Sequence, residues 1–581
     1  MKQNISNKNN IVKIIEKLAA KREKILALTP EDALKEIIND NEALPLIHSF
    51  AEDDLRLLIW EIGIADALPL IAMASSKQIT YILDAESWNK DRFDINAALN
   101  WFFALKEADP KRLLKWFLQE EPEEKKDLLN FILNRLISVG VREKNQEPSD
   151  FDDDFFTFDD LFYIKIKSFA DSEIKKEKIE ELIKSFLQDM AKYNYPLFQK
   201  ILFAASAIIP AETEEDLFRM KNIRLAEKGF VPYYEAVSIY QPLNRQTLKK
   251  KGKKIFFKKI AIKTTDMPAV FLKHTDQKDL FARAVRLIKN PDIITGIYYE
   301  FTSLCNHIIS ADKKIIKSKP ELDKSVKKAA GYLSMALETF YNKEKPSQKN
   351  KEKFCADIIS KYMLADIFRY GYKPVAALKK KAKQFVEKSF FKKNGFSLSF
   401  LDEKLAGICG GVLLDKPLFF DNYKNGNLYK DFASQKEIEY TDKELNKAIA
   451  ADMLLKKLNI KTDKIKDKTL TSFISYKNLL LTFWVEKINL PLPLTKEELI
   501  KFFNAIFEKK DNKKNRIKES AKKDFLSQVV FKNFKDQKNI SAQLSAVLKE
   551  LFDELEEEYK YIEDFKFLDT RYVKLFLTEA L

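Results

Sequence analysis

Histidine and glycine are scarce in this sequence of 581 residues, which contains 3 and 12 of them. With only His48, His274 and His307, imidazole-based catalysis and histidine-rich metal sites have few candidates. So few glycines cannot supply the turns of a β-propeller, and no Walker-type loop, nucleophile elbow or HExxH motif occurs. The sequence therefore assigns no catalytic residue, no metal ligand and no cofactor, and it favours a function other than catalysis.

Cysteine and long apolar runs are lacking as well. Cys305, Cys355 and Cys409 lie far apart and form no CxxC pair, so we expect free thiols, as in a reducing cytoplasm. The longest apolar runs, such as 203–210 and 479–485, are shorter than the roughly 20 residues that cross a bilayer. The N-terminus has no apolar signal-peptide core. We predict a cytoplasmic protein without a transmembrane segment, whose oligomeric state is open.

The residues that are abundant favour helix. Hydrophobic residues make up 45% of the chain and aromatic residues 12%, which is ample for packed cores. In residues 52–101, apolar residues recur at helical spacing, as at Leu55, Leu58 and Ile59, and each run soon meets a capping or stop residue. Short helices joined so tightly can bury their apolar sides only on one another. We predict a mainly α protein whose N-terminal part is an α-solenoid. The expected helix starts and stops are Thr29-Pro30, Gly63, Asp66, Ser75 or Ser76, Asp94 and Asp109-Pro110.

The pattern along the chain predicts six segments. Around residues 136–170, the alternating runs LISVGVRE and LFYIKIK predict a β-hairpin. Further on, we expect separate helices at 351–369 and 374–390. The segments are an N-terminal tail and helix (1–28), a superhelix of short helices (29–135), the hairpin insertion with a helical extension (136–240), a basic linker (241–278), a helical bundle (279–427) and a lysine-rich helical region (428–581).

The charge is unevenly distributed along the chain. The net charge is +15, from 102 basic and 87 acidic side chains. Residues 1–240 carry 33 basic and 43 acidic side chains, whereas residues 241–581 carry 69 and 44. Only 14 of the basic residues are arginine, the residue that nucleic-acid readers use for bidentate contacts. The two parts are oppositely charged, so they can attract each other as readily as an outside partner.

One basic run is a candidate anion or nucleic-acid site. Its lysines surround Phe256 and Phe257, and phosphate charge dominates nucleic-acid affinity. A lysine-rich linker is the favoured interpretation, ahead of nucleic acid and then of an anionic membrane surface. The run consists of Lys249, Lys250, Lys251, Lys253, Lys254, Lys258 and Lys259.

Three other patterns favour structural roles. The acidic cluster of Asp150, Asp152, Asp153, Asp154, Asp159 and Asp160 lacks the glycine and glutamate of a calcium loop, so we interpret it as a solvated turn. The segment Gly407 to Gly411 interrupts an apolar helical run and indicates close packing or a helix end rather than a phosphate cradle. We interpret Trp60, Trp88, Trp101 and Trp116 as core anchors rather than as a cofactor site.

Several stretches resemble a bacterial family of long, cytoplasmic, helical proteins of unknown function. They include LIWEIGIADALPLIAMASSKQITYILDAESWNKDR, FFTFDDLFYIKI, IPAETEEDLFRMKNIRLAEKGFVPYYEAVSIYQPL and LAGICGGVLLDKPLFF. The resemblance covers most of residues 29–435 and implies no reaction, ligand or catalytic residue. More distantly, residues 29–135 are similar in rhythm to the N-terminal superhelical domain of MgtE-type magnesium transporters. That similarity implies stacked helices used for protein contacts, and a fold alone does not fix a function.

Three hypotheses about function follow from these patterns. The first is a non-enzymatic scaffold or adaptor that binds other proteins. The second is a nucleic-acid-binding protein that uses the basic C-terminal half. The third and weakest is an enzyme of unknown class on a helical fold.

Overall fold

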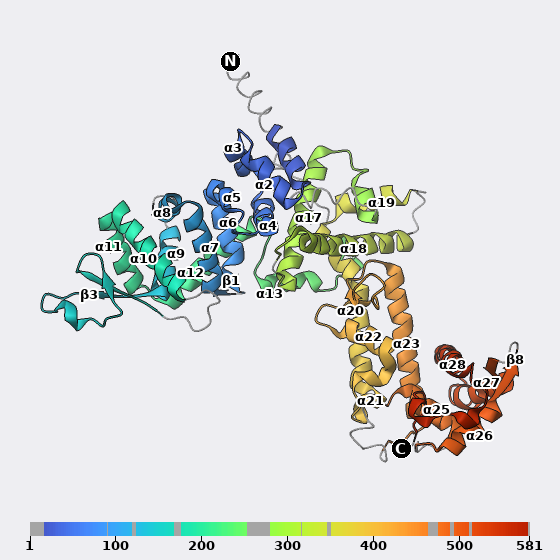
Figure 1. Ribbon diagram of the computed structural model, residues 1–581. Helices are drawn as coiled ribbons and strands as arrows, with labels where there is room; N and C mark the ends of the chain where they lie inside the picture. Colours follow the sequence, from blue (N-terminus) through green and yellow to red (C-terminus); the bar gives the residue numbers. More distant parts are fainter. Residues whose placement is uncertain are drawn as a thin grey trace. The chain divides into compact units, whose positions relative to one another are not determined.

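The computed structural model of the chain is mainly helical, with four small antiparallel sheets among its described residues (Figure 1). It divides into two compact units, Met1–Tyr370 and Gly371–Leu581. The predicted mainly α fold with small hairpins is therefore confirmed. The structure describes residues 17–578, except 90, 119–123, 168–175, 252–278, 315, 345–349, 463–473, 488–492 and 511–513.

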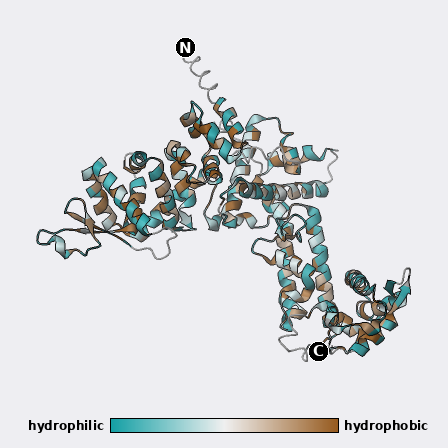
Figure 2. Cartoon of the chain, in the orientation of Figure 1, coloured by the Kyte–Doolittle hydropathy of each residue, from teal (hydrophilic) through white to brown (hydrophobic). Residues whose placement is uncertain are grey.

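The first unit begins with a row of short helices that stack on one another. Each early helix packs against the next but one: α2 on α4, α3 on α5, α4 on α6, and α5 on α7. This alternation is the contact pattern of a solenoid. In Figure 2 the helices carry brown apolar residues beside teal polar ones, as expected for helices that bury one side. The helices are α2 (Pro30–Ile38), α3 (Ala43–Ser49), α4 (Glu52–Ile62), α5 (Leu68–Met73), α6 (Ser76–Glu86), α7 (Ile95–Ala108), α8 (Pro110–Leu118) and α9 (Glu124–Leu136).

Local capping chemistry sets where these helices begin. Thr29 accepts a hydrogen bond from the Asp32 amide, and Ser75 forms a capping box with Gln78. Asp94 accepts from two amides in the first turn of α7. These predicted caps are confirmed, whereas α5 starts after Ala67, one residue beyond the predicted Asp66. Gly63 does end α4, with φ of +97°.

The predicted hairpin is present and gains a third strand. β3 (Ile137–Val141) pairs with β5 (Phe162–Ile166), Ile137 opposite Ile166, and β4 (Phe156–Thr157) pairs with the other edge of β5. The two-stranded prediction missed β4 because a strand of two residues has no readable alternation. Glycine suits position 140, where an added Cβ would lie 2.8 Å from the ring of Phe151.

Two further groups of helices complete the first unit. α11 and α12 pack on α9, and α12 also contacts α6 and the short strand β2 (Arg92–Phe93). α16 packs on α18 and α19, while α17 packs on α18, α13 and the short 3-10 helix at 237–240. The helices are α10 (Lys176–Tyr193), α11 (Tyr195–Ala207), α12 (Pro210–Ala226), α13 (Tyr233–Ala236), α14 (Arg245–Lys250), α16 (Leu280–Val285), α17 (Pro291–Asp312), α18 (Lys319–Glu344) and α19 (Lys351–Lys361).

One helix corrects a predicted boundary. Separate helices at 351–369 and 374–390 are wrong, because α20 (Leu364–Lys388) runs without a break through Pro374. A proline inside a helix removes one backbone donor but need not end the helix when the flanking turns are packed. Here Tyr372, Val375 and Leu378 around the proline are all buried.

The second unit is built around α23, which packs against α22, α25, α28 and the short helix α21. Two hairpins, β6–β7 and β8–β9, lie at its helix ends. Its elements are α21 (Phe390–Lys393), α22 (Asp402–Leu413), β6 (Phe419–Phe420), β7 (Tyr429–Lys430), α23 (Gln435–Lys457), α25 (Tyr476–Glu486), α26 (Lys496–Ile506), β8 (Phe507–Lys510), β9 (Lys514–Ile517), α27 (Glu519–Leu526) and α28 (Lys538–Tyr559).

The glycines of residues 407–411 lie inside α22 and receive the β6–β7 hairpin. A Cβ added at Gly411 would lie 2.6 Å from the ring of Tyr429 and 2.9 Å from the carbonyl oxygen of Leu418. Tyr429 also donates a hydrogen bond from its hydroxyl to the Gly407 carbonyl at 3.0 Å. The glycines thus serve close packing.

None of the described helices combines the length and the apolar character that a membrane crossing requires.

The glycine packing generates a stability prediction. Gly411→Ala forces Tyr429 and the Leu418 backbone to move, so we expect it to lower the free energy of unfolding by about 1–3 kcal/mol. Gly410→Ala is the matched control, because its Cβ would lie 3.5 Å from the Tyr429 hydroxyl, an ordinary contact. In a helix interior that change raises stability by about 0.5–1 kcal/mol. Thermal unfolding followed by circular dichroism measures both, and equal shifts would contradict the packing argument.

Candidate binding site around Trp88

Trp88 stands on a two-residue strand that links α6 to α7. β1 (Trp88–Asn89) pairs with β2 (Arg92–Phe93), which places Trp88 opposite Phe93. The amide of Asp94 closes this ribbon by donating to the Ser87 carbonyl at 2.9 Å. The indole packs edge-on against Phe93, with 5.2 Å between centroids, and lies 5.5 Å from Phe218 of α12. The ribbon therefore fixes Trp88 against α12.

An open pocket of about 450 Å³ lies on one side of Trp88. Trp60 of α4 and Trp101 of α7 line it as well, so three of the five tryptophans of the chain share one pocket. The rings of Trp60 and Trp101 meet edge to face at 6.5 Å. We call this the tryptophan pocket. Its polar lining residues are Glu86, Asn89, Asp94, Asn100, Glu107 and Lys317.

A buried ion pair supports the inner wall of the tryptophan pocket. Glu86 accepts hydrogen bonds from Arg56 at 2.6 Å and from the indole N–H of Trp60 at 3.0 Å. Arg56 is 6% exposed and also donates to the Ile316 carbonyl at 2.6 Å. Burial opposes its charged form, but the nearby carboxylates of Asp53 and Glu86 outweigh burial and raise the pKa of Arg56. The guanidinium thus stays charged and holds α4, α6 and the segment before α18 together.

Lys317 brings a cation into the same pocket from a distant part of the chain. Its ammonium lies 4.7 Å from the centre of the Trp60 ring. The segment that carries it is fixed, since the backbone amide of Lys317 donates to Glu321 and Lys319 pairs with Glu61 of α4 at 3.2 Å. The face of Trp60 therefore accepts an ammonium ion in this structure.

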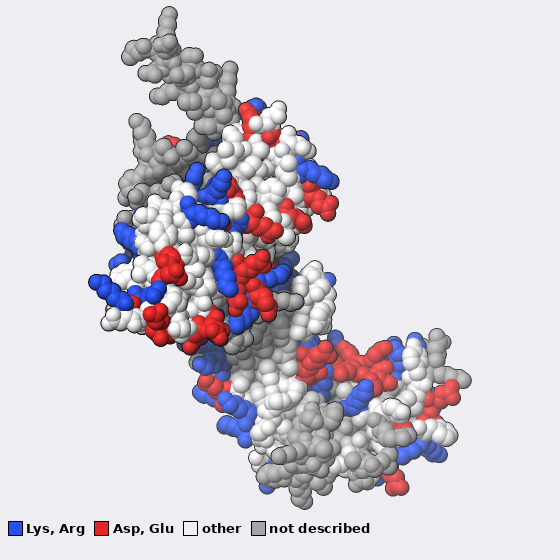
Figure 3. Space-filling view, turned by 60° about the vertical axis from the view of Figure 1, so that its left-hand side comes forward, with Lys and Arg blue, Asp and Glu red and all other residues white. Residues whose placement is uncertain are grey.

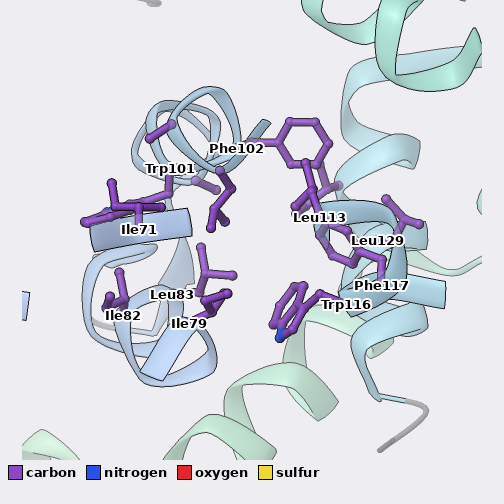
Figure 4. Packing of buried hydrophobic residues seen from close by; sticks show 14 of the residues in the cluster. Ile71, Ile79, Ile82, Leu83, Trp101, Phe102, Leu113, Trp116, Phe117 and Leu129 are labelled. Atoms are coloured by element: carbon purple, nitrogen blue, oxygen red, sulfur yellow. The ribbon is translucent and has the colours of Figure 1, made fainter. Parts of the chain in front are cut away.

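Trp88 also lines a second, more enclosed cavity of about 70 Å³. We call it the inner cavity. Among the described residues, Trp88 is the one that lines both the inner cavity and the tryptophan pocket. Figure 4 shows that the indole of Trp116 extends from α8 toward Ile79 and Leu83 of α6. The apolar lining comprises Leu83, Trp88, Phe93, Ala98, Phe102, Leu105, Trp116, Phe117, Leu128, Ile132 and Leu217.

Two buried donors that line the inner cavity have no hydrogen-bond partner among the described residues. They are the hydroxyl of Ser87 and the indole N–H of Trp116, whose residues are 1% and 2% exposed. The charged groups of the lining are, by contrast, paired. Arg224 binds Asp84 through two bonds of 2.7 and 2.8 Å, and Lys125 donates to Ser76 at 2.7 Å.

Lys221 covers Trp88 from α12. Its ammonium lies 5.0 Å from the centre of the Trp88 ring and 5.3 Å from that of Phe218. Burial lowers the pKa of Lys221 to about 8, although the negative charge of Asp84 acts in the opposite direction. This lysine is therefore charged at neutral pH and loses its proton just above it.

A family of unknown function matches residues 11–579, nearly the whole chain. The chain belongs to DUF6178. This confirms the predicted resemblance to a family of unknown function and brings no reaction or ligand with it. No curated protein and no solved structure matches the DUF6178 chain, so the more distant likeness to MgtE-type transporters is not shown and carries no argument.

The predicted lysine run lies largely outside the described residues. Lys249 and Lys250 end α14 and are exposed, and Lys251 pairs with Asp366 at 2.7 Å. The other four lysines, Lys253, Lys254, Lys258 and Lys259, fall in 252–278, which the structure does not describe. Figure 3 shows basic and acidic side chains next to one another on the face that it presents. The anion-site assignment of this run stays a prediction.

The acidic cluster forms a turn with partners of its own. Asp152 and Asp154 lie 3.6 and 3.2 Å from the ammonium of Lys165. Asp159 accepts from two amides and from the hydroxyl of Tyr195; burial opposes its charge, but these bonds lower its pKa. Within the described ranges, no three histidine, cysteine or carboxylate side chains converge as metal ligands would.

The cysteines are free and buried. Burial raises the pKa of Cys355 to about 11 and that of Cys409 to about 12, so both are protonated at neutral pH. Burial also raises the pKa of Cys305 far above its usual range. On the same helix, His307 bonds through Nδ1 to the Ser303 carbonyl at 2.9 Å. None of these thiols is placed to act as a nucleophile.

The tryptophan prediction is right for two residues and incomplete for two. Trp101 and Trp116 are buried core residues, at 3% and 2% exposure. Trp60 and Trp88 are half-buried and line the tryptophan pocket, as the buried Trp101 also does. Sequence reasoning also missed Arg56 and Glu86. The sequence did contain a signal for Arg56, because it is a charged residue between Leu55 and Leu57 in an otherwise apolar run. A charge buried at such a position needs a partner of opposite charge, which is Glu86.

The buried pair at the pocket wall generates a second prediction. Glu86→Gln leaves Arg56 buried without its main carboxylate, so we expect the free energy of unfolding to fall by about 3 kcal/mol. Glu107→Gln changes an exposed carboxylate of the same pocket and should alter stability by less than about 0.5 kcal/mol. Urea unfolding of both variants measures the difference. Similar midpoints for the two would contradict the role given to Glu86.

Lys221 generates a prediction about pH. The pKa of this lysine is about 8 in the folded chain, against an ordinary value of 10.5. Between these values the unfolded chain binds more protons, so this residue makes stability rise with pH. We expect Lys221→Met to be more stable than wild type at pH 7, and this gain to shrink as the pH rises to 10.

The control for this prediction is Arg219→Met, an exposed residue two positions away on α12. Its difference from wild type should not vary over the same pH range. Urea midpoints at pH 7, 8, 9 and 10 give both series. A gain for Lys221→Met that stayed constant with pH would show that Lys221 keeps an ordinary pKa.

Proposed function

We propose that this DUF6178 chain is a non-enzymatic scaffold that binds a partner protein in the tryptophan pocket of its first unit. One observation carries the proposal: three of the five tryptophans line a single open pocket of about 450 Å³ together with three carboxylates. Tryptophan is among the residues that contribute most to protein binding, because its large ring buries apolar area at low entropic cost. The stacked short helices around it supply a rigid support for such a surface.

The lining supports a partner segment that carries a basic side chain. Glu86, Asp94 and Glu107 outnumber the single lysine, Lys317, among the charged residues of the pocket. Ring faces and carboxylates together attract an ammonium or guanidinium group. Lys317 already occupies this kind of position over Trp60. A partner lysine or arginine would therefore find both stacking surfaces and negative charge.

The polar groups of the pocket favour recognition over chemistry. Glu86 is held by Arg56 and Trp60, and Asp94 accepts from the amides of Asn96 and Ala97 at the start of α7. Both carboxylates are thus already bonded to groups of the chain, which leaves them less available to a reacting substrate. This is the support for a binding role, in preference to an enzyme on a helical fold.

A cytoplasmic location is part of the same proposal. It is supported by three buried cysteines that are all free, as expected in a reducing compartment. Nucleic-acid binding through the basic half stays a separate prediction, which the experiment below distinguishes.

The proposal is tested by filling the pocket from an exposed position. Ala65 lines the pocket and is exposed, so Ala65→Trp should fold normally and occupy the space. Tagged wild type and variant are used in pull-downs from nuclease-treated native lysate. We expect a protein partner that wild type retains and that Ala65→Trp loses by at least about tenfold, since tenfold is only 1.4 kcal/mol of binding free energy.

Two further variants test whether the loss of the partner is specific to the tryptophan pocket. Ala207→Trp adds the same side chain at an exposed residue of α11 outside the pocket and should retain the partner. Glu107→Lys reverses one pocket charge and should weaken retention as well. Equal recovery of the partner by wild type, Ala65→Trp and Glu107→Lys would contradict the proposal. A parallel pull-down from lysate without nuclease that recovers only nucleic acid would instead support nucleic-acid binding by the basic C-terminal half.

A further inference from the structure

The inner cavity contains two donors that the fold itself leaves unused. Ser87 and Trp116 line it, and neither the Ser87 hydroxyl nor the Trp116 indole N–H has a hydrogen-bond partner in the described part of the chain. Both residues are at least 98% buried. Buried polar groups in native proteins nearly always have a partner, so two unused donors at one cavity indicate an acceptor that is not part of the chain.

The charges around the cavity restrict what that acceptor can be. Asp84 and Arg224 neutralise each other through two short bonds, and Lys125 is engaged with Ser76 and lies 5.1 Å from the centre of the Trp116 ring. An ion entering the cavity would need an unused opposite charge to offset its desolvation. The paired lining therefore favours an uncharged molecule.

The size and the lining of the inner cavity restrict the possible acceptor further. At about 70 Å³ the cavity is about half the size of a cavity of about 150 Å³ that accommodates benzene in another protein, so its occupant must be smaller than benzene. Most of the lining is aromatic or aliphatic, including Phe102, Leu105 and Ile132. Ordered water needs two to four polar partners, and the two unused donors supply only the minimum, because Thr80, Lys125 and the Asp84–Arg224 pair are engaged with the chain.

We infer that the inner cavity is a binding site for a small, uncharged molecule with an apolar body and an oxygen acceptor, such as a short-chain ketone. A carbonyl oxygen has two lone pairs and no hydrogen to donate, which suits a site whose unused groups are both donors. Acetone, with four non-hydrogen atoms, is the smallest ketone and is smaller than benzene. The observations behind this site are different from those behind the partner proposed for the tryptophan pocket, so either proposal can fail without the other.

The test uses the full chain and two probes of the same shape. Acetone and 2-methylpropene differ only in that an oxygen replaces a CH₂ group. Protein labelled with ¹⁵N at tryptophan gives indole N–H resonances for the five tryptophans, and Trp116→Phe identifies the one from Trp116. We expect acetone to shift the Trp116 resonance saturably and downfield, because its oxygen accepts from that N–H. The resonance of Trp484, in the second unit, should not move.

Variants distinguish a ligand-binding site from an empty packing defect. Ser87→Ala removes one unused donor and leaves no further buried group unpaired, so the chain should fold. Its affinity for acetone should fall about tenfold, while its affinity for 2-methylpropene stays within about twofold of wild type. Thr80→Leu enlarges a side chain that lines the cavity and should abolish binding of both probes.

Three results would overturn the inference. The first is no saturable shift of the Trp116 resonance with acetone. The second is an equal effect of Ser87→Ala on both probes. The third is a Trp116 N–H in contact with bound water that acetone fails to displace, which would assign the donors to solvent.

Discussion

The helices at the start of this chain are too short to be stable alone, and everything else in the first unit follows from that constraint. Helices of 6 to 14 residues fall near or below the length at which an isolated helix forms in water. Their apolar sides must be covered by neighbours, and stacking on the next helix but one provides the cover. The result is a continuous core that runs from α2 to α12.

Polar residues set the register of this stack at a few buried points. The side-chain amide of Gln78 is 1% exposed and donates to the carbonyls of Ile47 and Phe50, so the end of α3 is tied to the start of α6. Arg56 of α4 donates to Glu86 of α6 and to the carbonyl of Ile316, and so ties these three segments together. Apolar packing tolerates sliding, whereas a buried hydrogen bond has one correct partner. These bonds give the stacked helices one arrangement.

Much of the fold could be read from the sequence, because helix starts are local. Thr29, Ser75 and Asp94 are capping residues whose partners lie within three positions, so the chain itself contains the whole signal. The path of α20 through Pro374 was missed because burial on both sides of the proline depends on distant residues.

The candidate site was harder to predict for the same reason. Trp60, Trp88 and Trp101 come from neighbouring elements and were recognised as aromatic anchors, but their arrangement around a pocket depends on packing. Lys317 joins them from more than 200 positions away, and Lys221 reaches Trp88 from another helix. No periodicity connects such positions. The free donors of Ser87 and Trp116 are likewise visible only once every neighbour has been placed.

The shared wall at Trp88 has a thermodynamic consequence. One indole ring borders both the tryptophan pocket and the inner cavity. A molecule that displaces this ring from one side changes the space available on the other, so occupancy of the two sides is energetically linked. Such linkage is reciprocal. If an occupant of one cavity changes the affinity of the other cavity for its ligand by some factor, that ligand changes the affinity of the first cavity by the same factor. A side chain fixed by a ribbon of two residue pairs thus makes two neighbouring cavities into one thermodynamic unit.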